Sequence, residues 1–294
     1  MSQHYATPLA FKSALEARLR NLAPSRIVRN RQLLIFERFL ARIIKEFDCV
    51  ILKGGLALEL RIDAARTTKD IDLRVEGSPD ETLLRLQNAG QLDLGDFMTF
   101  EVAFNTDHPD IQNDGMPYTG KRFRVECRLA GKIYGNPFQA DVAFGDPVVE
   151  TIETITAPDT LAFAGIEPPT LPLYPIETHV AEKLHAYTMP RANPNTRVKD
   201  LPDIALLASV RAIEADLLRK ALELTFKFRK THAVPSEVPD PPVEWHKTYA
   251  KLAKDNGLVW SDLDTVTAAA KAFLNPILAD QISRTWDPKA WQWR

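Results

Sequence analysis

Two stretches of the chain decide its fold: Lys53-Gly54-Gly55-Leu56-Ala57-Leu58 and, shortly after, Thr67-Thr68-Lys69-Asp70-Ile71-Asp72-Leu73. The apolar residues Cys49 to Leu52 predict a short strand, which the glycine pair ends. A helix is expected from Leu56 to about Leu60. Residues 70–75 alternate between polar and apolar side chains, as in a half-buried strand. The sequence therefore predicts a strand, a glycine turn, a helix and a second strand in succession.

The two aspartates of the second stretch are candidate metal ligands. Because side chains on a strand alternate with a period of two, Asp70 and Asp72 project from the same face. Their oxygens suit Mg²⁺ or Mn²⁺, which would bridge a nucleotide triphosphate. The turn at Gly54-Gly55 offers backbone N–H groups to phosphate oxygens. The alternative interpretation is a solvated strand edge beside an ordinary glycine turn.

Further strands and helices surround these two stretches. Helical spacing of apolar residues predicts a helix over 33–44, and alternation predicts a strand over 122–129. The segment 138–144 follows a Gly-Asn turn and is the expected hairpin partner. Mixed helices and strands over residues 1–167 favour an α/β (α+β) lobe with N-terminal helices.

A proline-rich stretch at 168–175 is interpreted as a linker. Beyond it the strand signal fades, and residues 176–294 are expected to form a mainly helical C-terminal lobe. A second proline-rich break is expected at 231–242.

Composition narrows the class of protein. The chain has 294 residues, 45% of them hydrophobic, and a formal net charge of -2, which argues against a uniformly basic nucleic-acid coat. Two cysteines are too few for a disulfide framework. Neither a membrane span nor a signal peptide is recognisable, so a cytoplasmic protein without a membrane partner is expected. A monomer is expected as well.

Basic residues gather locally. Arginines line one face of the strand at 122–129, and a second group follows at 227–230. They are candidates for contacts to RNA phosphates, with solvated faces as the alternative. The candidate contacts are Arg122, Arg124, Arg128, Lys227 and Arg229.

The glycine pair together with Arg66–Leu73 resembles the first motif of the polymerase-β-like nucleotidyltransferases. More narrowly, it resembles the AbiEii family, also called MenT-type toxins, of bacterial type IV toxin–antitoxin systems. The resemblance covers roughly residues 12–210 and includes the segments 37–42, 181–186 and 197–203. One departure is Leu56, which supplies no hydroxyl where the family often has Ser or Thr.

The resemblance implies a polymerase-β-like core with a mixed sheet, and it assigns roles to further residues. Asp141, a charge in the middle of an apolar strand, becomes the third carboxylate, which would share a metal or receive the acceptor proton. Lys183 would contact the triphosphate, and either Asp200 or Asp203 would belong to the site, with Asp200 preferred. The expected catalytic residues are Asp70, Asp72, Asp141, Lys183 and Asp200, with Asp70, Asp72 and Asp141 as metal ligands. The expected nucleotide-binding residues are Lys53, Gly54, Gly55, Arg66, Thr68 and Lys183.

The resemblance also implies a function. An Mg²⁺- or Mn²⁺-dependent toxin would transfer a nucleoside monophosphate from an NTP to the 3′ end of tRNA, blocking aminoacylation and translation. A separately encoded winged-helix antitoxin would neutralise it, with or without direct binding. The alternatives are nucleotidylation of a protein or small molecule, and an inactive protein that binds RNA or a partner.

Overall fold

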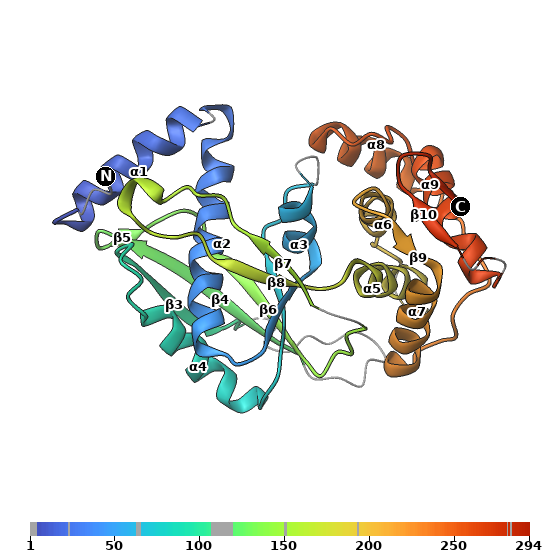
Figure 1. Cartoon of the computed structure of the whole chain (residues 1–294), viewed down its shortest axis with the longest axis horizontal. Coiled ribbons are helices and arrows are strands. Elements are labelled where there is room, and N and C mark those ends of the chain that lie inside the picture. Colours follow the sequence, from blue (N-terminus) through green and yellow to red (C-terminus); the bar gives the residue numbers. More distant parts are fainter. Residues whose placement is uncertain are drawn as a thin grey trace.

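The computed structural model describes residues 5–22, 24–62, 66–106, 120–149, 152–192, 194–280, 282 and 284–294. It contains a mixed sheet followed by a mainly helical part, which confirms the α/β fold class expected from the sequence. Figure 1 shows the two parts side by side, the sheet with α1 to α4 on one side and α5 to α9 on the other. We call them the first and the second lobe.

The sheet of the first lobe is built around β1 and β2, the two strands predicted from the opening motifs. Its strand order is β3-β4-β6-β2-β1-β8-β7, and β5 pairs with β4 at one side. Most neighbours are antiparallel, but β2 pairs parallel to β6, and β1 pairs parallel to β8. The strands are β1 (Val50–Lys53), β2 (Ile71–Val75), β3 (Met98–Phe104), β4 (Gly120–Leu129), β5 (Lys132–Ile133), β6 (Phe138–Phe144), β7 (Glu153–Thr156) and β8 (Thr170–Leu173).

The proline-rich stretch at 168–175 contains a strand of this sheet. β8 pairs with β1 through Leu52 and Leu173, and with β7 along Glu153–Thr156. Proline has no backbone N–H to donate to a neighbouring strand. Pro172 is tolerated in β8 because this strand pairs with its neighbours only over short stretches. The sheet therefore continues to Leu173, and the expected division of the chain into domains stays a prediction.

Helices of the first lobe cover the sheet. The long helix α2 crosses one face (Figure 1), and most of its residues from Leu34 to Ile43 are buried. Apolar side chains from α1, α2, α4 and the strands form one hydrophobic core. The helices are α1 (Pro8–Leu22), α2 (Ile27–Glu46), α3 (Gly54–Arg61) and α4 (Pro79–Gln91), with short 3₁₀ turns at Pro24–Arg26 and Ala162–Ala164.

The second lobe has its own hydrophobic core, which also takes in Leu58 of α3. Its helices are α5 (Ile176–Thr188), α6 (Asp200–Ala208), α7 (Ala215–Arg229), α8 (Trp245–Asn256) and α9 (Leu263–Leu278). The short strands β9 (Ile213–Glu214), β10 (Thr285–Asp287) and β11 (Gln292–Trp293) form a small sheet that the sequence did not predict. Trp286 and Trp293 of this sheet are packed against Phe273 of α9.

No helix in the described ranges is both long and apolar enough to cross a membrane.

Candidate active site

Four charged residues form a row across adjacent strands of the sheet. Lys53 of β1 pairs with Asp72 of β2, Asp72 with Asp141 of β6, and Asp141 with Arg122 of β4. Because residues in register point to the same face, the row presents two carboxylates between two cations. Asp70, two residues before Asp72, belongs to this face as well.

Burial and a neighbouring negative charge raise the pKa of two carboxyl groups at this site. Burial raises the pKa of Asp72 to about 6, and the negative charge of Asp141 adds to the effect. Burial and Asp141 also raise the pKa of Asp70. The structure thus brings together Asp70, Asp72 and Asp141, and their mutual repulsion favours a cation between them.

Arg122 neutralises one of these acids. Its Nε and Nη2 donate to the two carboxylate oxygens of Asp141, each at 2.8 Å. This geometry is bidentate, the strongest that a guanidinium and a carboxylate form. The sequence identified Arg122 only as a candidate RNA contact. Its pairing with Asp141 could not be predicted, because it depends on the register of β4 against β6.

The glycine pair allows the start of α3 to approach the carboxylates. Gly54 has φ of +66°, and a Cβ there would collide with the carboxylate of Asp72. A Cβ on Gly55 would lie 2.8 Å from Oγ1 of Thr68 and 3.5 Å from Nη1 of Arg66. No side chain caps the first turn of α3, so its N–H groups are available to an anion.

An ion cluster on the other side of the site joins the two lobes. Arg66 donates to both oxygens of Asp203, at 2.9 and 2.8 Å, and Lys183 donates to the same carboxylate at 2.7 Å. Lys183 also contacts Asp200, at 3.3 Å. Although burial alone would raise it, the two cations lower the pKa of Asp203 to about 2. Of the two acids that the sequence left open, Asp203 is the one that both cations contact.

A second cluster extends from the row into the second lobe. The ammonium group of Lys53 contacts Asp146 and, at 3.2 Å, Glu182 of α5. Arg229 of α7 donates to Glu182 at 2.8 Å and to Asp146 at 3.3 Å. Burial would raise the pKa of Asp146, but Lys53 and Arg229 hold it below its usual value. The burial of Asp146 could not be predicted from the sequence, because no local pattern shows that two distant cations converge there.

Comparisons with known proteins agree with this geometry. The family model described as "Nucleotidyl transferase AbiEii toxin, Type IV TA system" matches residues 38–291. The chain belongs to the AbiEii family. Membership supports transfer of a nucleoside monophosphate in general and implies an antitoxin partner.

Among the similar solved structures, that of a MenT toxin shows the same fold as this AbiEii protein. The MenT4 nucleotidyltransferase toxin from Mycobacterium tuberculosis H37Rv is 19% identical, with a TM-score of 0.57, and the match covers 95% of this chain and 92% of that one. JHP933 from Helicobacter pylori is 16% identical, with a TM-score of 0.46 and coverage of 86% and 93%. No curated protein has a significantly similar sequence.

The donor set of this AbiEii protein fits a divalent metal in part. Asp70 and Asp72 supply oxygen ligands of the kind that Mg²⁺ and Mn²⁺ take. Within the described ranges, however, no group of three His, Cys, Asp or Glu side chains is arranged to hold a metal ion. Both oxygens of Asp141 accept hydrogen bonds from Arg122.

The remaining candidate RNA contacts differ in their surroundings. Arg124 donates to Glu126 at 2.6 Å, and Arg128 donates to Glu101 at 3.1 Å. Arg229 is buried in the second ion cluster, whereas Lys227 is exposed. A role in RNA binding stays a prediction for all of them, and both Lys227 and Arg124 are exposed.

Proposed function

We propose that this AbiEii protein transfers a nucleoside monophosphate from an NTP to the 3′ end of tRNA. The resulting tRNA could not be aminoacylated, and translation would stop. The observation that supports this best is the pairing of Asp72 with Asp141, with Asp70 on the same face, beside the uncapped start of α3. An arrangement of acids next to a phosphate-binding helix end is suited to phosphoryl chemistry.

The triphosphate would lie between the two lobes. The N–H groups of Gly54 and Gly55 would bind its oxygens from the first lobe, with the hydroxyl of Thr68 close to Gly55. The Thr68 hydroxyl would replace the one that the family often has at the position of Leu56, which is buried in the core here. Arg66 and Lys183 would bind from the other side, and Lys183 already lowers the pKa of Asp72 by its charge.

Asp141 would receive the proton of the acceptor hydroxyl. The oxygen of that hydroxyl attacks the α-phosphorus, a new P–O ester bond forms, and the bond to the β-phosphate bridging oxygen breaks. Pyrophosphate leaves with the electron pair, and the hydroxyl proton passes to the carboxylate. To accept this proton, Asp141 must give up at least one of its two hydrogen bonds from Arg122.

Asp70 and Asp72 would hold Mg²⁺ or Mn²⁺, which would supply charge neutralisation on the phosphates. Deep burial of Asp203 and its two cations would keep Arg66 and Lys183 in place as this happens. We further propose a monomer in the cytoplasm, neutralised by a separately encoded winged-helix antitoxin that need not bind it directly.

The test is incubation of the purified protein with total tRNA, Mg²⁺ and each α-labelled NTP separately, with Asp72→Ala alongside. We expect label in RNA with one NTP and none with the variant. Label on protein or on a small molecule would show that the acceptor is that molecule and not tRNA. No label with any NTP would favour a protein that only binds RNA or a partner.

A further inference from the structure

A basic face on α8 lies apart from the residues considered so far. Lys247, Lys251 and Lys254 are exposed and are spaced four and three residues apart, so they share one side of the helix. In the part of the chain that the structure describes, none of the three takes part in an ion pair. The single acid of α8, Asp255, leaves an excess of two positive charges on the helix.

Packing determines which side of α8 faces solvent. Trp245, Tyr249 and Ala253 are buried at intervals of four residues on the opposite side. The Trp245 indole donates to the carbonyl of Asn195 at 3.0 Å, and the Tyr249 hydroxyl donates to the carbonyl of Trp260 at 2.9 Å. The lysines are therefore held outward by a fixed helix.

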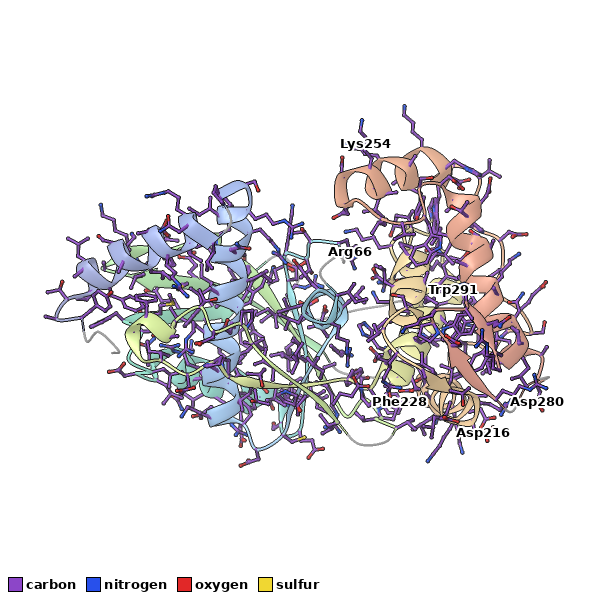
Figure 2. The ribbon with its side chains drawn as sticks, turned by 45° about the horizontal axis from the view of Figure 1, so that its top comes forward. Arg66, Asp216, Phe228, Lys254, Asp280 and Trp291 are labelled. Carbon is purple, nitrogen blue, oxygen red and sulfur yellow. The ribbon has the colours of Figure 1, made fainter. Side chains whose placement is uncertain are left out.

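The end of α8 contacts the loop that leads into the active site. Asn256 accepts from the backbone N–H of Thr67 at 3.2 Å and donates to the carbonyl of Leu252 at 2.9 Å. Thr67 lies between Arg66 and Thr68, three residues before Asp70. Figure 2 shows Lys254 at the end of α8 that is nearer the first lobe, which carries Arg66.

Two further lysines continue from α8 to the carboxylates. Lys69 is exposed immediately before Asp70, and Lys199 is exposed at the start of α6. Partial burial and the positive charge of Arg66 lower the pKa of Lys199. Positive charge thus extends from α8 across the loop to the reacting groups.

We propose that Lys247, Lys251 and Lys254 bind the phosphate backbone of an acceptor RNA whose 3′ end enters the active site past Lys69 and Lys199. The inference rests on the proposed function, and it assigns a surface to the acceptor. The three lysines span seven residues, or about 10 Å of helix axis, which matches about three nucleotide steps along one strand. When an ammonium group without a carboxylate partner binds a phosphate, counterions of the RNA are released. Arg124 and Arg128 of β4, by contrast, already have carboxylate partners.

The experiment measures binding of fluorescently labelled total tRNA without NTP, at several salt concentrations, for the wild-type protein and Lys247→Gln/Lys251→Gln/Lys254→Gln. We expect the triple variant to bind about 10- to 100-fold more weakly at low salt, with a salt slope smaller by about 2. The matched control is Lys45→Gln/Lys132→Gln/Lys220→Gln, which removes three exposed lysines from α2, β5 and α7. The control should bind tRNA as the wild-type protein does.

Equal loss of affinity in both triple variants would overturn the proposed surface, because the effect would then follow from net charge alone. Unchanged affinity and slope in the α8 variant would overturn it too, while tRNA labelling by the wild-type protein would leave the proposed function standing. A wild-type protein that neither binds nor labels tRNA would refute the tRNA acceptor itself, and the α8 surface with it. Melting curves of all variants verify that they are folded.

Discussion

At the scale of single residues, the site depends on which partner each charge takes. The row of Lys53, Asp72, Asp141 and Arg122 places two like charges side by side, with a cation at each end. Lys53 turns toward Asp146 and Glu182, whereas Arg122 takes both oxygens of Asp141. Burial and the charge of Asp141 raise the pKa of Asp72, and the positive charge of Lys53 offsets this only in part.

Loss of Arg122 should make the carboxylates better metal ligands. We expect Arg122→Gln to bind Mn²⁺ about tenfold more tightly in the absence of nucleotide, since a competing cation within a few ångströms is gone. Titration of the purified protein, followed by the electron paramagnetic resonance signal of free Mn²⁺, measures this. Arg128→Gln is the control, because it removes an arginine of the same strand that pairs with Glu101 instead. Equal Mn²⁺ affinity in wild type and Arg122→Gln would show that Arg122 does not compete.

The sequence predicted single residues well where local spacing carries the information. The alternation around Ile71 indicated that Asp70 and Asp72 share a face, whereas Asp141 was assigned to the site through the family resemblance. The partners of Arg122, Arg229 and Asp146 could not be predicted in this way. Each is defined by strand register or by packing between segments that are 19 to 93 residues apart.

At the scale of elements, α2 carries charges into the interior of the first lobe. Arg38 and Arg42 are buried and pair with Asp96. Glu37 is only 7% exposed and lines an apolar cavity of about 200 Å³ between α1, α2 and α3. Burial raises the pKa of Glu37 to about 7, with smaller contributions from the charges of Asp96 and Asp159.

Glu37 should therefore make stability depend on pH. Its carboxyl binds a proton more tightly in the folded than in the unfolded state, so wild-type stability falls as the pH rises from about 4.5 to 7. Glu37→Gln stays neutral, and we expect it to be more stable than wild type above pH 7 by about 3 kcal/mol, with no difference near pH 4. Urea unfolding across this pH range measures the effect.

A second glutamate provides a control of opposite sign. The hydrogen bond from Arg31 lowers the pKa of Glu16, so Glu16→Gln should lose stability at neutral pH, and that loss should shrink in acid. A Glu37→Gln profile parallel to that of wild type would show that folding does not change the pKa of Glu37.

The elements themselves were largely predictable because their periods are local. The segment 138–144 that follows the Gly-Asn turn is β6, and helical spacing over 33–44 identified the central part of α2, which runs from Ile27 to Glu46. β8 was missed, since the prolines around Leu171 indicate a linker and the strand exists only through its pairing with β1 and β7. The two-residue strands β9 and β11 are too short to show any alternation.

At the scale of the whole molecule, two ion clusters connect the lobes on either side of the carboxylates. Arg66 of the first lobe pairs with Asp203 of α6, and Lys53 and Asp146 meet Glu182 and Arg229 of α5 and α7. The clusters bring the residues proposed to bind the triphosphate, from both lobes, to one place. Cationic side chains that the sequence analysis assigned only to phosphate binding therefore also form the ion pairs that connect the two lobes.

Arg229 and Lys227 separate these two uses of charge. Both lie in the last turn of α7, but Arg229 is 5% exposed and bonded to Asp146 and Glu182, whereas Lys227 is exposed. Arg229→Gln leaves the buried Asp146 and the half-buried Glu182 with less compensation, so we expect its free energy of unfolding to fall by about 3 kcal/mol. Lys227→Gln should change stability by less than about 0.5 kcal/mol. Urea unfolding at pH 7.5 compares the two. Normal stability of Arg229→Gln combined with weaker tRNA binding would instead favour the RNA contact that the sequence suggested, and would mean that Lys53 alone suffices to neutralise Asp146.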